Sequence, residues 1–186
     1  QEEKLFYAAC ADAVYISSRH WMAILNLTQN TVARWGIPLP EQPVLAAISG
    51  TGALTAGRYQ VCYTNLVDGL IGGSGMIAEI DILTDNSTIQ LLNMPDGVIA
   101  WATDPDGNTF YRAAEEQALI TGIETMEPLP TFLCSPPSPM KFIRRAFGRL
   151  WGALDNRLIY SEPYRYDLFK STNGFTFSTE ILLVAF

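Results

Sequence analysis

Histidine and cysteine, which supply many metal ligands and catalytic groups, are scarce in this chain. His20 is the single histidine, and Cys10, Cys62 and Cys134 lie far apart without a CxxC pair. A zinc site needs clustered ligands of these types, and a hydrolase triad needs a histidine beside its nucleophile. No GxSxG motif surrounds any serine. We therefore expect no metal site, no cofactor and no enzymatic activity, and we expect the cysteines to be small buried apolar residues.

Long hydrophobic runs and a basic leader are also missing. No apolar run approaches the roughly 18 residues of a membrane span, and QEEKLFYAAC lacks the basic start and apolar centre of a signal peptide. We expect no contact with a membrane. The chain starts at Gln1 and stops in the strand-like run ILLVAF. Because domains normally end at a soluble surface, we expect a segment of a longer polypeptide or a chain completed by partner subunits.

Charge is sparse and unevenly distributed. Charged residues make up 17% of the chain and apolar residues 48%, which is typical of a globular protein. Residues 41–127 hold two basic and twelve acidic side chains, whereas residues 141–186 hold seven basic and four acidic ones. This asymmetry indicates two modules.

The most informative stretch is LTAGRYQVCYTNLVDGLIGGSGM, residues 54–76. Tyr59, Val61 and Tyr63 alternate with polar or small residues, which predicts a half-buried antiparallel strand. Asp68-Gly69 and the glycines at 72–75 predict turns. A glycine cluster also suggests a phosphate-binding loop, but no Lys-Ser/Thr and no helical pattern follow it.

Similar patterns predict several strands in the middle of the chain. The expected strands are residues 45–49, 57–66, 76–83, 88–92, 98–103 and 109–113. Turn residues separate them, and no βαβ rhythm is present, so the pattern favours a sandwich or barrel.

The flanks predict further strands. Residues 5–16 predict two strands joined around Ala11-Asp12, while residues 19–27 fit either a helical turn or a strand. Residues 140–154 have helical spacing, but their two glycines disfavour a helix. We favour strands there, with a hairpin turning at Asp155-Asn156. EKLFYAACADAVYIS and GRLWGALDNRLIYSE share one pattern, which suggests the inner hairpin of a propeller blade.

Two acidic segments could in principle hold a calcium ion or a pair of catalytic carboxylates. The segment from Asp104 to Asn108 has the alternating oxygens of a calcium loop, with Glu115 at the twelfth position, but residues 110–113 read as a strand without ligands. A Pro-Asp-Gly turn explains this segment better. Glu115 and the adjacent Glu116 would face opposite sides of a strand, so no pair for glycoside cleavage stands out.

The motifs also resemble a known family. TAGRYQVCYTNLVDGLIGGSG and IAWATDPDGNTFYRAA resemble fibronectin-III/Ig-type inserts of bacteriophage virion proteins, although Trp101-Ala102-Thr103 replaces the usual aromatic-Arg-Thr. The flanks FYAACADAVYIS and GRLWGALDNRLIYSEPYRYDLF resemble blade strands of the β-propeller in tail nozzle (tubular) proteins of short-tailed phages.

This resemblance implies a mainly β fold in four parts. An Ig/fibronectin-III-like β-sandwich, residues 38–127, would be flanked by β-propeller-blade-like strands. Those strands would lie in residues 1–37 and 140–186, and a Pro-rich linker, residues 128–139, would lead back to them.

The resemblance also implies a structural role in the virion. Copies of the chain would assemble into a ring that forms the DNA exit tube of the phage tail, next to adaptor or fibre proteins, with room for passing contact with genomic DNA. The alternative is a fibronectin-III-like binding module that recognises carbohydrate or protein at a cell surface.

Aromatic and basic residues gather near the C-terminus, a composition enriched at protein interfaces. The candidate subunit interface comprises Arg157, Tyr160, Tyr164, Arg165, Tyr166, Phe169 and Lys170. Packing inside the fold and stacking on nucleic-acid bases remain the alternatives for these residues.

Overall fold

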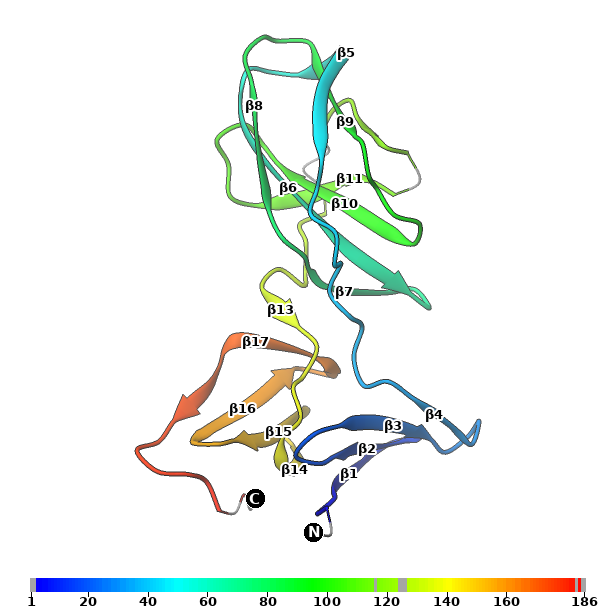
Figure 1. Ribbon diagram of the computed structural model, residues 1–186, viewed down its shortest axis with the longest axis vertical. Coiled ribbons are helices and arrows are strands. Elements are labelled where there is room, and N and C mark those ends of the chain that lie inside the picture. Colours follow the sequence, from blue (N-terminus) through cyan, green and yellow to red (C-terminus); the bar gives the residue numbers. More distant parts are fainter. Residues whose placement is uncertain (1–2, 116, 124–126, 183, 185–186) are drawn as a thin grey trace. The chain divides into compact units, whose positions relative to one another are not determined.

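The computed structural model describes residues 3–115, 117–123, 127–182 and 184 (Figure 1). The chain divides into two compact units: unit 1 combines Gln1–Ile37 with Cys134–Phe186, and unit 2 is Pro38–Leu133. Every regular element in the described residues is a strand, and the strands pair antiparallel. The predicted mainly β class is therefore confirmed.

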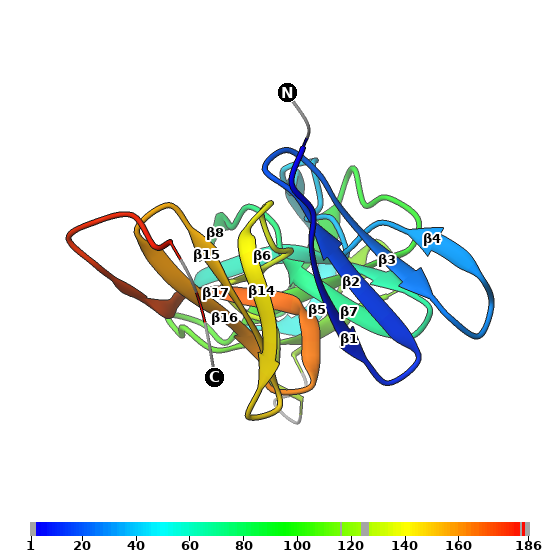
Figure 2. The ribbon, with the colours of Figure 1, turned by 90° about the horizontal axis from the view of Figure 1, so that it is seen from below.

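Unit 1 contains two antiparallel sheets (Figure 2). The first sheet has the order β1 (Phe6–Cys10), β2 (Ala13–Ser17), β3 (Met22–Asn26) and β4 (Thr31–Ala33). The second sheet has the order β13 (Cys134–Ser135), β17 (Arg165–Thr176), β16 (Arg157–Glu162), β15 (Arg149–Leu154) and β14 (Lys141–Ala146). Neighbouring strands follow one another along the chain, except that β13 pairs with β17.

The turns of unit 1 follow the sequence. Ala11 and Asp155 begin two-residue hairpin turns with φ values of 50° and 52°, as the twist of paired strands requires. Phe147 and Gly148 form the turn between β14 and β15, also at positive φ. Both hairpins and the strand reading of residues 140–154 are thus confirmed, and the undecided residues 19–27 contain β3.

The two sheets of unit 1 share one apolar core. Trp35, which follows β4, is fully buried in it and donates its indole N–H to the backbone carbonyl of Tyr166 at 2.8 Å. The ring of Tyr15 on β2 lies edge-on to both, 5.1 Å from Trp35 and 5.7 Å from Tyr166. The segments before and after unit 2 therefore form a single body.

The internal sequence echo aligned β1 and β2 with β15 and β16, and both pairs are antiparallel hairpins with two-residue turns. β1 and β14 each form an edge of their sheet and lie against each other.

Unit 2 also contains two antiparallel sheets. The larger sheet has the order β11 (Phe110–Ala114), β10 (Val98–Thr103), β6 (Gly57–Val67) and β7 (Leu70–Ser74), with β8 (Ala78–Ile82) also paired to β6. The smaller sheet has the order β12 (Leu119–Ile120), β9 (Ser87–Leu91) and β5 (Ala46–Leu54).

One core fills the space between these sheets, and the central strand β6 supplies much of it. Tyr59, Val61 and Tyr63 are buried there against Ile89 and Leu91 of β9. The predicted inward face of β6 is thus confirmed.

The opposite face of β6 differs from the prediction of a half-buried strand. Cys62 and Thr64 are fully buried, and Cys62 packs in a second apolar cluster with Trp101, Phe110 and Leu129. Trp101 donates its indole N–H to the Thr64 hydroxyl at 2.8 Å. The outward side chains of β6 are therefore covered by residues that come much later in the sequence.

That later chain is the Pro-rich segment predicted as a linker over residues 128–139. Its first part belongs to unit 2, because Leu129 donates its N–H to Phe110 and the buried Thr131 hydroxyl donates to the Gly72 carbonyl at 2.6 Å. Its second part enters unit 1, where Cys134 pairs with Lys170 on β17. The segment connects the units, but each part is packed rather than extended in solvent.

Two strand predictions also need correction. The glycines of 72–75, predicted as a turn, lie mostly in β7, because the tighter turn is made at Asp68-Gly69 with φ values of 50° and 77°. The strand expected at 76–83 is the shorter β8. The C-terminal run ILLVAF was expected to be a strand; its residues 183, 185 and 186 lie outside the described part, and residues 181, 182 and 184 are in no strand.

Candidate interaction surfaces

The predicted interface residues lie on β16, on β17 and at the turn between them, all in unit 1. They do not form one surface. Phe169 is only 5% exposed and belongs to the core of unit 1, with Tyr166 packed beside that core. Phe169 is therefore not available to a partner, because its position in the β17 register directs it toward the other sheet.

Tyr160 lies on the outward face of the second sheet, in the middle of an aromatic row. Its ring centroid is 4.7 Å from that of Trp151 on β15 and 6.1 Å from that of Phe175 on β17. The guanidinium of Arg149 sits over the Tyr160 ring, 4.9 Å from its centroid. We call the surface formed by Trp151, Tyr160 and Phe175 the Tyr160 face.

Sequence reasoning named only Tyr160 in this row. Trp151 is directly opposite Tyr160 in the β15–β16 register, whereas Phe175 is opposite Leu158 in the β16–β17 register. The signal for Trp151 was present, because a two-residue turn at Asp155-Asn156 fixes which residues of the hairpin are paired. Phe175 could not be found this way, since the β16–β17 register shifts at two irregularities.

The basic residues of the predicted interface are engaged within the sheet. Arg165 binds Asp167 with both atoms of its fork, at 2.9 and 3.0 Å, and this bond is the largest cause that raises the Arg165 pKa. Lys170 lies 3.9 Å from Glu162, and Arg157 donates to the Ser171 carbonyl at 2.9 Å. These three cations therefore already have partners within the sheet.

Two exposed aromatic residues occupy neighbouring turns at one end of the second sheet. Tyr164 is 77% exposed and Phe147 is 84% exposed, with φ values of 56° and 53°. Tyr164 donates its N–H to the carbonyl of Gly148, which joins the two turns. Bulky side chains are uncommon in this left-handed region, so the fold tolerates backbone strain while presenting these rings to solvent.

The first sheet of unit 1 has an outward face made only of apolar residues. The registers place Tyr7, Ile16 and Ala23 in one cross-strand row and Ala9, Val14, Leu25 and Val32 in the next. We call this surface the Val14 face. Tyr7 is 68% and Val32 is 71% exposed, so unit 1 leaves much of this face in solvent. Apolar residues gathered on one sheet face are typical of an interaction surface.

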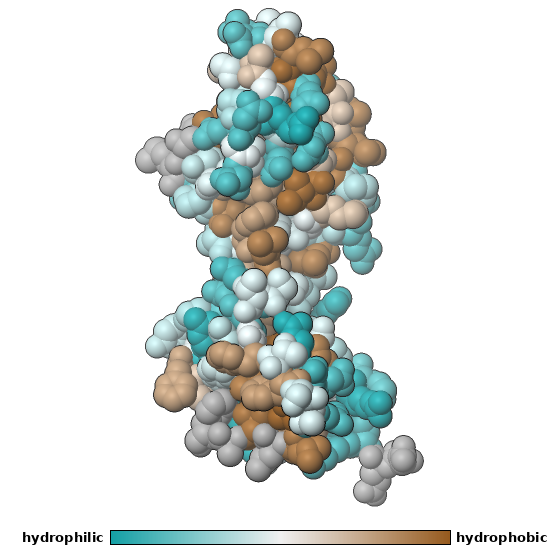
Figure 3. All heavy atoms as spheres, turned by 90° about the vertical axis from the view of Figure 1, so that its left-hand side faces the viewer, coloured by the Kyte–Doolittle hydropathy of each residue, from teal (hydrophilic) through white to brown (hydrophobic). Residues whose placement is uncertain are grey.

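Apolar surface is visible on unit 1 in Figure 3, which views the side where β16 and β17 lie. Phe175 on β17 is about half exposed. The Tyr160 face is therefore accessible at its β17 end.

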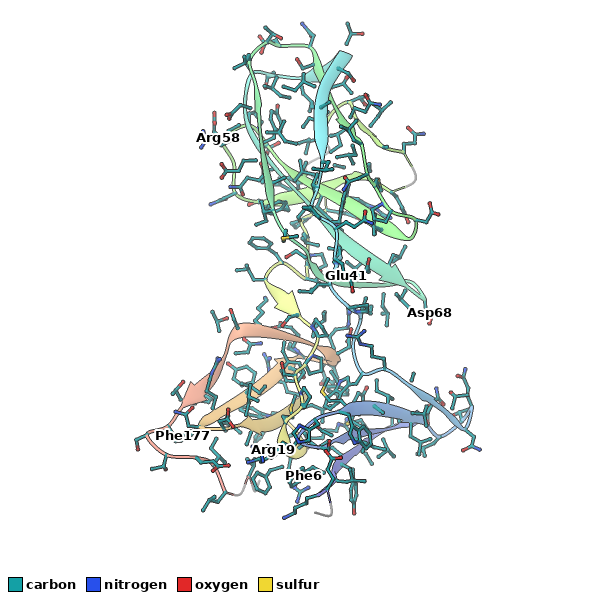
Figure 4. The ribbon with its side chains drawn as sticks, viewed as in Figure 1. Phe6, Arg19, Glu41, Arg58, Asp68 and Phe177 are labelled. Carbon is teal, nitrogen blue, oxygen red and sulfur yellow. The ribbon has the colours of Figure 1, made fainter. Side chains whose placement is uncertain are left out.

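A basin of about 630 Å³ lies at one end of unit 1 (Figure 4). It is lined by Glu3, Lys4, Phe6, Arg19, His20, Lys141 and Phe142. The Lys4 ammonium lies 5.4 and 5.9 Å from the two phenylalanine ring centroids, and Lys141 pairs with Glu180 at 2.5 Å. Charges of both signs face the basin.

Other chemical sites weighed from the sequence find ordinary structural roles. Asp106 accepts the backbone N–H of Arg58 and Gly107 donates to the Asp104 carbonyl, so this segment is a turn. Burial raises the pKa of the Cys62 thiol to about 12, which keeps it protonated and unreactive. Exposed His20 donates its backbone N–H to the Ser18 hydroxyl.

The described residues contain neither a cluster of metal ligands nor a membrane-spanning helix. In that part of the chain no group of three histidine, cysteine, aspartate or glutamate residues could hold a metal ion. The same residues contain no helix with the length and apolar character needed to cross a membrane.

Comparison of the chain with protein-family models, with curated proteins and with solved structures finds no match.

Proposed function

We propose that this chain is a structural virion protein, a segment of a phage tail nozzle or adaptor. Copies of it would assemble into a ring around the DNA exit tube. Unit 1 would contribute two blades of a β-propeller, and unit 2 would be an Ig/fibronectin-III-like sandwich inserted between them. Function in this reading is assembly, without a catalytic step.

The observation that carries the proposal is the repeated sheet in unit 1. The first sheet is the four-stranded meander β1–β4. The second sheet contains the four-stranded meander β14–β17 with the short strand β13 added beside β17, and the two sheets share one core. Their first strands, β1 and β14, lie against each other. Radial stacking of four-stranded meanders with adjacent first strands is the arrangement of propeller blades.

Unit 2 supports the second half of the proposal. Its sheet order β11-β10-β6-β7 corresponds to the G-F-C-C′ sheet of Ig-type domains, and β5 and β9 pair as strands B and E do. The unit is inserted between β4 and β13, and its core is separate from that of unit 1. Such an insert can decorate a ring without interrupting the blades.

The surfaces of unit 1 favour assembly over the other functions considered. The Val14 face and the Tyr160 face are apolar and partly exposed, as expected of interfaces. The cations near Tyr160 are paired with carboxylates or carbonyls, which argues against a dedicated nucleic-acid site.

The proposal is tested on particles of the virus that encodes the chain. Purified particles are digested for quantitative mass spectrometry and are labelled with antibodies raised against unit 2. We expect peptides of the chain in a fixed multiple per particle, and antibody label at the tail. Absence of these peptides from infectious particles would refute the proposal, and soluble protein that binds host-cell glycans would instead support the binding module.

A further inference from the structure

The core of unit 2 is open to solvent beside β5. Ile48 on β5 pairs with Ile89 on β9, and Ile89 is fully buried between the two sheets. Residues that are directly opposite each other in a ladder share one face of the sheet, so Ile48 also lies on the core side. Ile48 is nevertheless 47% exposed. An apolar residue of the inner face therefore lacks a complete cover at this edge.

The backbone of β5 also has an unpaired edge. The smaller sheet has the order β12-β9-β5, so β5 pairs with β9 and with no other strand of the described chain. Leu92 donates its N–H to the carbonyl of Leu45, which continues the register of this ladder. Hydrogen-bonded and non-hydrogen-bonded pairs alternate along an antiparallel ladder. The N–H and C=O groups of Ala46 and Ile48 therefore point away from β9, toward the unpaired edge.

The chain that precedes β5 does not pair with this edge. Pro38, Pro40 and Pro43 lack the N–H group that a paired strand would donate. The side-chain amide of Asn93 fixes the entry to β5 instead. It donates to the Pro43 carbonyl at 2.7 Å and accepts the N–H of Leu45 at 2.8 Å. The edge is thus left open to a strand from another chain.

The other strand edges in the described part of unit 2 are charged, covered or short. β8 carries the exposed Glu79 and Asp81, and charged side chains on an edge strand disfavour pairing with another chain. β11 is bonded along its free edge by residues 127–129, and β7 accepts a hydrogen bond from Thr131. β12 has only two residues. By contrast, residues 42–57, which include β5, contain no charged side chain.

We propose that the free edge of β5 pairs antiparallel with β5 of a second copy of this chain, which joins the smaller sheets of two units 2 into one continuous sheet. A second copy is the expected occupant because the edge is complementary to itself. With Ala47 on the two-fold axis, Ala46 lies opposite Ile48 of the second copy, so a small side chain faces a large one. The same register brings the outward N–H and C=O groups of both strands into hydrogen-bonded pairs.

This contact goes beyond the ring proposed for unit 1, because a two-fold contact joins copies in pairs and does not close a ring. Unit 2 holds two basic and twelve acidic side chains, so two copies of it repel each other. An uncharged edge is where they can meet. Salt screens the repulsion and should strengthen the pairing, whereas it would weaken a contact built on opposite charges.

The test is disulfide cross-linking of the full-length chain. Ala47 lies opposite the exposed Gln90, so a cysteine at this position is on the outer face of the sheet. In the proposed register the two copies of residue 47 form a non-hydrogen-bonded pair with Cα atoms about 4.5 Å apart, which a disulfide can bridge. We expect Ala47→Cys to form a covalent dimer under mild oxidation at least about tenfold faster than Thr51→Cys, at an exposed residue of the same strand. The three native cysteines are buried, and the unmodified chain controls for them.

Two further variants ask whether the edge itself makes the contact. In the Ala47→Cys background, Ile48→Lys places a charge at the edge and should slow cross-linking to the rate of Thr51→Cys. Leu119→Lys is the matched control and should leave the rate unchanged, since Leu119 is exposed to a similar extent on the opposite edge of the same sheet. Circular dichroism and thermal melting check that each variant folds. Ala46→Pro, which removes an N–H that points away from β9, replaces Ile48→Lys if that variant does not fold.

Three results would overturn the inference. They are equal cross-linking rates for Ala47→Cys and Thr51→Cys, a rate that is unchanged by the edge substitution in a folded chain, and a rate that falls as salt is raised. None of them decides the proposed virion role. Peptides of the chain in purified particles, combined with any of these results, would keep that role and reject only the pairing of β5.

Discussion

Trp35 and Tyr166 are 131 residues apart in sequence, yet the indole N–H of Trp35 reaches the Tyr166 carbonyl at 2.8 Å inside the core of unit 1. The bond ties the segment before unit 2 to the segment after it. Unit 1 therefore forms only when the segment before unit 2 and the segment after it pack together. Loop closure over such a distance has an entropic cost, which the buried aromatic contacts around Trp35 must offset.

The first prediction concerns this junction. Trp35→Ala should destabilise unit 1 by about 3–5 kcal/mol, because a large buried ring and its hydrogen bond are lost together. Amide hydrogen exchange, read separately for strands of each unit, measures the change. Trp21→Ala is the matched control, since Trp21 is an exposed tryptophan of the same unit and should cost less than about 0.5 kcal/mol. Equal effects of the two substitutions would contradict the assigned core.

The second prediction concerns the end of unit 2. A fragment of residues 38–133 should fold by itself and be more stable than a fragment of residues 38–127 by about 2–4 kcal/mol. The longer fragment keeps buried Leu129 and the hydrogen bond from Thr131 to Gly72. Urea denaturation followed by tryptophan fluorescence compares the two. Identical midpoints would mean that residues 128–133 do not stabilise the outer face of β6.

The third prediction concerns the inner face of β6. Val61→Asp should unfold the 38–133 fragment, because a charge would enter an apolar core without a partner. Val67→Asp, at the exposed end of the same strand, should leave the fragment folded. Circular dichroism and thermal melting distinguish the variants. A cooperative transition in the Val61→Asp fragment would place this residue outside the core.

The fourth prediction concerns alkaline pH. Burial is the main cause that raises the pKa of Tyr15 and of Tyr63 to about 12, from an ordinary value of 10.0. The unfolded chain loses these protons first, so their contribution to stability is complete below pH 10 and is lost as pH rises toward 12. Urea denaturation at a series of pH values should show this loss. Tyr15→Phe and Tyr63→Phe should each reduce it, because each removes one of the two buried phenols.

Local chemistry was sufficient to predict much of the fold. The turn at Asp155-Asn156 and the alternation through Tyr59 and Val61 depend on neighbouring residues, and both were predicted correctly. The features that could not be predicted from the sequence depend on contacts between residues far apart in the chain. Cys62 is buried because Leu129 covers it, and no pattern within β6 encodes that contact.

The candidate site shows the same limit. Composition grouped Tyr160 with Phe169 and could not separate them, although Phe169 lies nine residues later and belongs to the core of unit 1. Their faces are decided by the irregular register between β16 and β17. The Val14 face was missed altogether, because short strands of small apolar residues have the same composition whether one face or both faces are covered.

The most direct test of the account is the mass of the intact chain in solution as a function of concentration. Size-exclusion chromatography with light scattering should give masses that rise above the 20.6 kDa monomer as concentration increases, because the proposed function is self-assembly. A folded wild-type chain that stays at 20.6 kDa across the whole concentration range would contradict the proposed assembly function.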